Sequence, residues 1–318
     1  LDALEAPPEV RRAYRAFDRD RALEHAADAA LTAVCRHDPR YPAALRALPD
    51  SPAVLHVAGD VARFEAMTAA AQPSVAIVGA RRASPYGLEV ARGLGRGLAA
   101  AGVTVVSGMA LGVDSAAHAG AVEAAGPTVA VLAGGADRPY PPSKRGLYAE
   151  IRARGCVVGE LPPGHVARRW CFPARNRIIA ALAGLTVVVE AMERSGSLIT
   201  AEFARDLGRD VGAVPGQVTS PLAAGPNALL ADGAQVVRRP EDALDAVCGV
   251  GGWQPRSAAA TVPAHLTAVH AAVAAGMGSP EALAQKGIAI TAALAGLAEL
   301  EVLGLVRRTP GGRYQVTV

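Results

Sequence analysis

The segment 168–177 reads RRWCFPARNR and holds four arginines, two aromatic side chains and no acid. Guanidinium groups bind phosphate oxygens in a forked geometry, and an aromatic ring offers a stacking face to an unpaired base. A proline at the start of a helix, here Pro173, leaves the N-terminal amides of that helix open to an anion. The segment predicts contact with single-stranded nucleic acid, against the alternative of an exposed basic turn with Phe172 in the core. Its candidate contacts are Arg168, Arg169, Phe172, Arg175, Asn176 and Arg177.

Two further segments place small or basic residues directly after apolar, β-branched runs. A glycine there lets a ligand approach the backbone, arginines add charge, and amides and hydroxyls donate to phosphate oxygens. The spacing does not fit the GxGxxG dinucleotide fingerprint. A turn with solvated arginines and a helix cap by Ser197 are the simpler alternatives. The candidates are Gly79, Arg81 and Arg82 after 75–78, and Ser195, Gly196 and Ser197 after 186–189.

Ser107 and Gly108 add another small-residue loop after a strand-like run, and Lys144 stands where a helix is expected to begin. A cation at that position conflicts with the helix dipole unless an anion or solvent compensates it. Asp114 and His118 lie four residues apart on the next expected helix, so a metal or acid–base pair is one interpretation. We favour a helix cap by Asp114 with His118 hydrogen-bonded nearby, because no further ligands occur at suitable spacing.

The chain carries no Ser/His/Asp or Cys/His pattern typical of nucleophilic catalysis, and no Cys/His cluster at metal-ligand spacing. Glu160 and Glu190 end two strand-like runs but are not evidently paired as a general acid and base. The sequence therefore predicts no catalytic residue, no metal and no cofactor.

The elements that must position these loops alternate regularly between Pro73 and Val237. Strand-like runs separated by amphipathic helical stretches indicate βαβ units in an α/β, doubly wound parallel sheet. Ligands bind such sheets at the carboxyl ends of the strands, where all the loops above are expected. The predicted strands are 75–78, 103–106, 128–132, 157–158, 186–189, 211–214 and 235–237, and helices are expected to begin near 88, 115, 144, 174, 198 and 227.

The flanks differ in pattern from this central part. Residues 1–68 read as short helices with one linking strand at 53–57, which predicts a small helical domain. Small residues at 249–261 predict a linker, and 262–318 has three expected helices followed by a hairpin, the outline of a winged helix. The third of these helices, Thr291–Leu303, has no Lys or Arg and two acids, so we expect protein contact or a weak accessory role rather than duplex reading.

Charge and composition narrow the class of protein. The net charge is only +3, but residues 73–237 carry 16 basic and 12 acidic side chains, so the positive excess lies in the predicted sheet. Four scattered cysteines, the absence of signal-peptide features and the absence of a long uncharged apolar stretch predict a cytoplasmic protein with no membrane contact.

The ordered set of motifs resembles the DNA-processing protein A family (DprA, also called Smf) over nearly the whole chain. One departure is Ala80, where that family usually has serine, which puts one hydroxyl–phosphate bond in doubt. The similar stretches are VAIVGARRASPYG at 75–87, SGMALGVDSAAH at 107–118, VAVLAGGADRPYP at 129–141, FPARNRII at 172–179, EAMERSGSLIT at 190–200, GRDVGAVPG at 208–216 and NALLADGA at 227–234.

The resemblance implies a sequence-independent single-stranded DNA-binding protein of natural transformation that protects incoming DNA and loads RecA, without known catalysis. It implies that Arg81 and Lys144 are the principal phosphate-binding residues and that Phe172 contacts a base. It also implies a homodimer through the C-terminal part of a Rossmann-like domain, with the contact at 217–237 near the RecA surface. The remaining residues that it places in or around the pocket are Gly79, Ser107, Gly108, Arg175, Asn176, Arg177 and Ser195–Ser197.

The predicted domains are an N-terminal helical domain and linker at 1–68, an extended Rossmann-like single-stranded-DNA-binding domain at 69–248, a linker at 249–261 and a winged-helix domain at 262–318. An alternative is a nucleotide-processing enzyme on a related fold, such as a nucleoside-monophosphate phosphoribohydrolase. That class carries a PGGxGT-type loop, and RSGSLIT at 194–200 lacks it. A purely structural scaffold leaves the arginine cluster unexplained.

Overall fold

The structure is a computed structural model that describes residues 12, 15–253, 262–303, 305–309 and 312–316. The chain divides into two compact units, Leu1–Arg256 and Ser257–Val318. Each unit is described by itself below.

Within the described residues, the first unit is built on one nine-stranded sheet with the order β1-β2-β6-β5-β4-β3-β7-β8-β9. The seven strands from β3 to β9 run parallel, and β2 and β1 continue the sheet antiparallel beyond β6. All seven predicted strands are confirmed to within about a residue. The strands are β1 Thr32–Cys35, β2 Val54–Gly59, β3 Ser74–Val78, β4 Thr104–Ser107, β5 Thr128–Leu132, β6 Cys156–Gly159, β7 Leu185–Val188, β8 Asp210–Ala213 and β9 Gln235–Val236.

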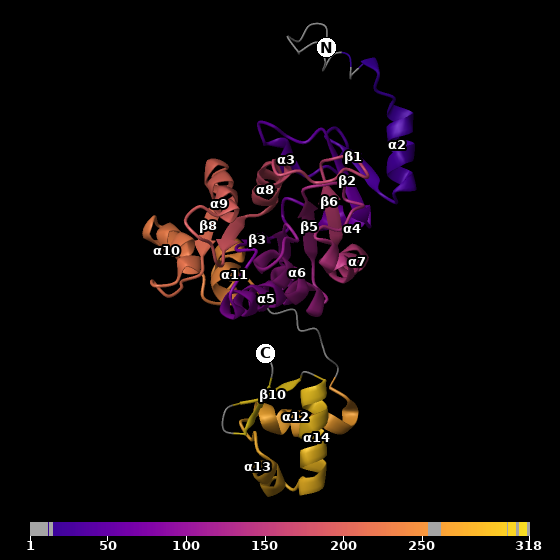
Figure 1. The fold of residues 1–318 in the computed structure, drawn as a ribbon. Helices are drawn as coiled ribbons and strands as arrows, with labels where there is room; N and C mark the ends of the chain where they lie inside the picture. The colour runs from indigo at the N-terminus through magenta and orange to yellow at the C-terminus, as the bar shows by residue number, and fades with distance from the viewer. Residues whose placement is uncertain (1–11, 13–14, 254–261, 304, 310–311, 317–318) are drawn as a thin grey trace. The chain divides into compact units, whose positions relative to one another are not determined.

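Helices cover both faces of this sheet, as Figure 1 shows. Successive side chains of β3 point to opposite faces, so Val75 and Ile77 pack in the core beneath α5 and α6, and Ala76 and Val78 pack beneath α8 and α9. The helices are α2 Arg19–Asp28, α3 Ala43–Arg46, α4 Val61–Met67, α5 Pro85–Ala100, α6 Val113–Glu123, α7 Arg145–Arg154, α8 Cys171–Leu182, α9 Gly196–Asp206, α10 Ala224–Ala231 and α11 Pro240–Cys248, with 3-10 turns η1 Pro142–Lys144 and η2 Pro221–Ala223.

Five of the six predicted helices begin two or three residues earlier than their hydrophobic periodicity predicts, and α7 begins one residue later. Side-chain caps set the first turns of two of them. Ser84 caps α5 by accepting a hydrogen bond from the Gly87 N–H at 3.1 Å, and Pro85 follows at the first helical position. Ser195 caps α9 in the same way through the Ser197 N–H.

The separate N-terminal helical domain predicted for 1–68 is not confirmed. The predicted strand at 53–57 forms as β2, but it pairs with β6 in the main sheet rather than linking two domains. The run 32–35 lies in the part for which short helices are expected, but it forms strand β1, paired with β2. The apolar side of this pair, including Leu55 and Val57, needs the sheet core to be buried, which overrides the helical periodicity.

The second unit contains the three helices and the hairpin that its sequence predicts. The winged-helix assignment and the boundaries of the linker at 249–261 stay predictions, and residues 254–261 lie outside the described part. Its elements are η3 Ala264–Leu266, α12 Thr267–Ala274, α13 Pro280–Gln285, α14 Ile290–Val302, and the antiparallel strands β10 Val306–Arg308 and β11 Tyr314–Val316.

The strand order creates a topological switch point at the carboxyl edge of the sheet. The chain runs outward from β3 through β4 and β5 to β6, then crosses back and continues with β7 on the other side of β3. The loops after β3 and β7 therefore diverge to opposite faces, which opens a crevice between them.

Candidate nucleic-acid interface

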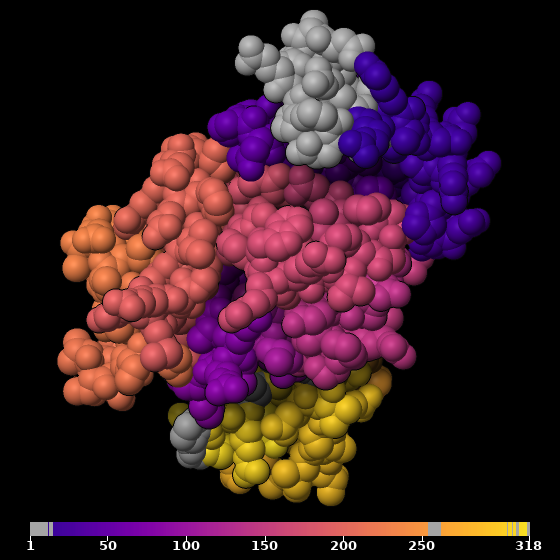
Figure 2. All heavy atoms as spheres, turned by 45° about the horizontal axis from the view of Figure 1, so that its top comes forward, coloured from indigo at the N-terminus to yellow at the C-terminus, as the bar shows by residue number. Residues whose placement is uncertain are grey.

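A pocket of about 850 Å³ occupies this switch point. It is bounded by the loops after β3 and β7 and by the starts of α6, α8 and η2. In Figure 2 the surface is hollowed between the segments coloured pink and salmon, which follow β6 and β7 in the chain. Of the predicted site residues, the pocket lining includes Gly79, Arg81, Arg82, Phe172, Arg175, Asn176, Ser195, Gly196 and Ser197.

The loop after β3 is fixed by Glu190, two residues after the end of β7. The backbone oxygen of Glu190 accepts from the Ala80 N–H at 2.6 Å, and its buried carboxylate accepts from the Ser84 N–H at 2.8 Å and the Ser84 hydroxyl at 2.5 Å. A Cβ on Gly79 would lie 2.9 Å from the Glu190 backbone oxygen, so only glycine allows this approach without a shift. The backbone that carries Arg81 and Arg82 is therefore held in place while both arginines are exposed.

Arg81 and Phe172 meet at this pocket. The Cζ of Arg81 lies 4.6 Å from the centroid of the Phe172 ring, within the range of a cation–π contact. The Tyr140 ring packs against Phe172 with centroids 5.4 Å apart and planes tilted by 55°. A cation and two aromatic rings thus lie together beside an open pocket, a combination suited to a phosphate and an unpaired base.

Hydroxyl and amide groups line the opposite wall. The Ser195 and Ser197 hydroxyls lie 2.7 Å apart, and both side chains are partly exposed. The Asn176 side-chain amide donates to the Gly196 carbonyl at 3.1 Å and so ties the start of α9 to α8. This wall offers hydrogen-bond donors to an anion, and the same loop also places Glu193 and Arg194 in the pocket lining.

Arg175 lines the pocket, but its side chain is buried and already bonded to the protein. Its guanidinium donates to the Gly108 carbonyl at 2.8 Å and also to the Val131 carbonyl. Burial lowers the pKa of Arg175 to about 10 and raises the pKa of nearby Asp114. A Cβ on Gly108 would fall 2.0 Å from the guanidinium, so Gly108 makes room for Arg175 and does not face the ligand itself.

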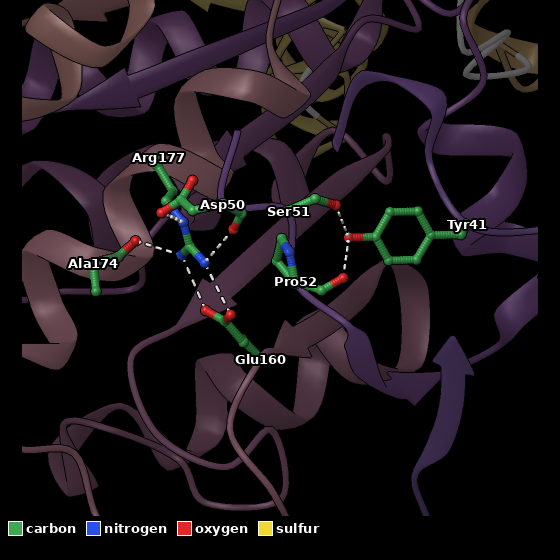
Figure 3. A network of polar contacts seen from close by, with 7 residues as sticks. All are labelled: Tyr41, Asp50, Ser51, Pro52, Glu160, Ala174 and Arg177. Carbon is green, nitrogen blue, oxygen red and sulfur yellow. Dashed lines mark hydrogen bonds and ion pairs between the residues drawn. The ribbon is translucent and has the colours of Figure 1, made fainter. Parts of the chain in front are cut away.

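Arg177 is the centre of a separate polar network, drawn in Figure 3. Its guanidinium forms a forked pair with the Glu160 carboxylate at 2.9 and 3.0 Å, and its Nε lies 2.7 Å from an Asp50 carboxylate oxygen. It also donates to the backbone oxygens of Ala174 and Asp50 at 2.7 and 3.0 Å. Burial lowers the pKa of Arg177, but the bonds and charges of Glu160 and Asp50 outweigh it and raise the pKa overall.

Asp114 and His118, both on α6, are buried and make hydrogen bonds within the protein. The expected helix cap by Asp114 is wrong, because Gly112 occupies the cap position and Asp114 lies inside the first turn. The buried Asp114 carboxylate instead accepts from the Gly108 N–H at 3.1 Å. His118 lies 2.7 Å from the Thr128 hydroxyl, and burial lowers its pKa to about 4. In the part of the chain that the structure describes, no cluster of His, Cys, Asp or Glu could hold a metal ion.

Five predicted site residues have places outside the pocket lining, besides Arg177. Ser107 is buried and donates to the Ile77 carbonyl at 2.6 Å, and Gly108 accepts from Arg175. Arg168 and Arg169 are exposed in the segment between β6 and α8. Lys144 ends η1, four residues after Tyr140.

Sequence reasoning missed Tyr140 and the second role of Glu190. Tyr140 belongs to the proline-rich loop before Lys144, and an exposed tyrosine between prolines is a signal for a ligand contact. The position of Glu190 after a strand suggests only a general acid or base. Its bonds to Ser84 link residues 106 positions apart, which sequence spacing does not reveal.

A family model described as DNA recombination-mediator protein A matches residues 32–248, which include the whole pocket and every strand of the nine-stranded sheet. The chain belongs to this family. The match begins at β1, in agreement with the structure, where β1 and β2 are part of the sheet.

Relatives of this recombination-mediator family include a DNA processing protein DprA of Mycobacterium tuberculosis, 47% identical over 213 residues. That alignment covers 66% of this chain and 54% of the relative, so the chain spans about half the length of that relative. Protein Smf of Synechocystis is 34% identical over 316 residues, covering 87% of this chain and 78% of the relative.

Solved structures of DNA processing protein A share the fold. The Streptococcus pneumoniae protein is 34% identical with a TM-score of 0.69, covering 76% of this chain and 82% of that chain. The Helicobacter pylori protein, described for its single-stranded DNA binding mode, is 28% identical with a TM-score of 0.59, covering 67% of this chain and 94% of that chain. The α/β architecture with a mostly parallel sheet is therefore that of the family.

Proposed function

We propose that this recombination-mediator family member binds the phosphate backbone of single-stranded DNA at the switch-point pocket, without sequence preference. The observation that carries the proposal is the Arg81 guanidinium over the Phe172 ring beside a pocket lined by serine hydroxyls and backbone amides. Phosphate contacts give affinity and salt dependence, and a stacking ring selects unpaired bases over a duplex. The description of the Helicobacter pylori relative as a single-stranded DNA binder supports the same conclusion.

The pocket suggests distinct roles for its residues. Arg81 and Arg82 are exposed and supply charge, Ser195 and Ser197 supply hydroxyl donors, and Phe172 supplies the stacking face. A base that stacks on the covered face of Phe172 must displace Arg81, which then is free to pair with a phosphate. Lys144, Arg168 and Arg169 extend the positive surface along the carboxyl edge of the sheet, and Ser107 and Gly108 shape the floor.

Arg175 and Arg177 have positioning roles in this proposal rather than direct phosphate contacts. Both guanidinium groups are buried and bonded to protein acceptors. Arg175 fixes the Gly108 loop and Arg177 fixes the start of α8, so together they orient the helix that carries Phe172 and Asn176.

The protein would act as a mediator of recombination in natural transformation that protects incoming strands and delivers them to RecA in the cytoplasm. The description of the matching family as a recombination mediator and the DprA names of the relatives support this role. No helix among the described residues is long and apolar enough to cross a membrane.

A homodimer through 217–237 is part of the same proposal. β9 is an edge strand of the sheet, and Val218 and Val236 are 92% and 52% exposed. An edge strand with one exposed valine, and a second exposed valine in the loop before η2, are suited to association with a second copy. Val236→Asp should convert the dimer to a monomer in light scattering; a variant with unchanged mass would contradict this contact.

We further propose that the protein is not an enzyme. The two acids that end strands are bonded within the protein, Glu160 to Arg177 and Glu190 to Ser84. The phosphoribohydrolase alternative predicts release of a free base from a nucleoside monophosphate, which a chromatographic assay of the purified protein would detect.

The function is tested by the affinity of single- and double-stranded oligonucleotides of the same sequence. Arg81→Ala and Lys144→Ala should each weaken single-strand binding, and wild type should prefer the single strand. Arg209→Ala removes an exposed arginine just before β8, at the opposite edge of the sheet, and serves as the control. Equal affinities of Arg81→Ala, Arg209→Ala and wild type would overturn the assignment of the pocket.

A further inference from the structure

The segment between β6 and α8 exposes an indole next to two unpaired arginines. Trp170 is 57% exposed, and Arg168 and Arg169 are also exposed. Within the described residues, none of these three side chains has a hydrogen bond, ion pair or ring contact. An exposed tryptophan does not gain the free energy that burial of an aromatic side chain provides. Its exposure beside two arginines therefore indicates a surface that binds a ligand.

The backbone beneath these side chains is held by the rest of the sheet edge. The Gly164 N–H donates to both oxygens of the Asp137 carboxylate at 3.0 Å, and the His165 carbonyl accepts from the Gly135 N–H at 3.0 Å. The Cys171 N–H donates to the Arg168 carbonyl at 3.0 Å, and its sulfur accepts from the Arg168 N–H at 3.2 Å. The segment is fixed while its side chains are free, which lowers the entropy cost of binding.

Trp170 does not serve the helix that it precedes. It occupies the cap position of α8, where its side chain makes no capping hydrogen bond. Trp170 and Phe172 lie two positions apart, so they project to nearly opposite sides of the first turn. Phe172 lines the pocket and Trp170 does not, so the indole offers a second aromatic face outside the pocket lining.

We propose that Trp170 stacks on a second unpaired base of the bound strand, with Arg168 and Arg169 neutralising the phosphates beside it. The site deepens the proposed function and rests on it, because it requires that single-stranded DNA be bound at this edge of the sheet. The ligand class follows from the chemistry: an indole face binds a base, and two flanking guanidinium groups bind the polyanion that carries it.

Tryptophan fluorescence tests the contact directly, because the chain has only two tryptophans. Trp253, which donates to Asp245 at 2.9 Å, is replaced in a Trp253→Phe variant so that Trp170 is the sole reporter. Oligothymidylate should quench Trp170, and a strand of abasic residues, which keeps the phosphates, should quench it much less. Unchanged Trp170 fluorescence at saturating oligothymidylate would overturn the inference.

Affinity variants separate stacking from charge. Trp170→Ala should weaken oligothymidylate binding about 5- to 150-fold, the range of base–aromatic stacking, leave abasic-strand binding unchanged and keep the salt slope. Trp170→Phe should restore most of the affinity. Arg168→Ala and Arg169→Ala should each lower the salt slope by about 1. Phe17→Ala, at a 64% exposed aromatic in the N-terminal segment, is the control and should match wild type.

The outcomes distinguish this inference from the function on which it rests. If wild type binds no single-stranded DNA, both fail. If wild type binds and loses affinity with Arg81→Ala but not with Trp170→Ala, the pocket stands and the second base site is wrong. A Trp170→Ala variant that changes self-association but not DNA affinity would also overturn it and indicate a protein contact instead.

Discussion

Replacement of Arg177 by alanine should destabilise the first unit without changing how the folded protein responds to salt when it binds DNA. The side chain is 8% exposed and makes a forked pair with Glu160, a close contact with Asp50 and two bonds to backbone oxygens. Removing one partner of a buried ion pair costs about 3–5 kcal/mol, because a charge is left uncompensated.

The partners of Arg177 reduce this cost. The side chains of Glu160 and Asp50 are 32% and 66% exposed, so water hydrates both after the arginine is removed. We therefore expect a loss of about 2–3 kcal/mol in the free energy of unfolding. For a unit of this size the melting temperature should fall by roughly 4–12 °C.

Urea unfolding followed by circular dichroism measures this loss, with Arg40→Ala as a matched control. Arg40 also makes a forked pair with a carboxylate, that of Asp38, but on the surface, where solvent screens the charges, so its loss should lower the free energy of unfolding much less than the loss of Arg177. In the folded variant the slope of log affinity against log salt should equal that of wild type. Unchanged stability together with a salt slope smaller by about 1 would refute the reasoning and make Arg177 a phosphate ligand.

Two further changes test the packing of α6. Gly120→Ala places a Cβ 2.0 Å from the Arg92 backbone oxygen of α5, so it should lower the free energy of unfolding by at least about 2 kcal/mol. As a control, Gly93→Ala adds a Cβ with no atom within 4 Å and should raise the free energy of unfolding by up to about 1 kcal/mol. His118 stays neutral in the fold because its pKa is lowered to about 4, while it binds a proton below its ordinary pKa of 6.5 when unfolded. The stabilisation that depends on neutral His118 is complete above pH 6.5 and is lost as the pH falls toward 4. Between about pH 7 and pH 5 the free energy of unfolding of wild type should therefore fall by about 2 kcal/mol more than that of His118→Gln. Parallel pH profiles of the two proteins in urea unfolding would contradict the buried neutral histidine.

The central sheet could be predicted because its strands are short apolar runs separated by glycine-containing turns. β3 and β5 are buried on both faces, so their sequences, SVAIV and TVAVL, are apolar after a first polar residue and show no polar/apolar alternation. The loops that carry chemistry follow from this, since parallel strands put their carboxyl ends at one edge. Helix starts were less accurate because capping, as at Ser84, depends on single hydrogen bonds.

The N-terminal part could not be assigned to the sheet from its own sequence. β1 and β2 are amphipathic strands that pair with each other, and β2 joins the sheet through β6, about a hundred residues later. No local pattern specifies this long-range pairing. Arginine roles were equally hidden. Arg169, Arg175 and Arg177 are the same residue type within one ten-residue segment, so the sequence does not distinguish them. Arg175 and Arg177 are buried against protein acceptors, whereas Arg169 is exposed.

Photo-crosslinking tests the central claim most directly, because it reports where a single strand lies on the protein. A strand that carries halogenated uracil is irradiated in complex with the full chain, and the crosslinked peptides are identified by mass spectrometry. The account predicts crosslinks to Phe172 and Tyr140 at the switch-point pocket, with loss of the Phe172 adduct in Phe172→Ala. Crosslinks confined to 257–318, with none to the loops after β3, β5 and β7, would contradict it.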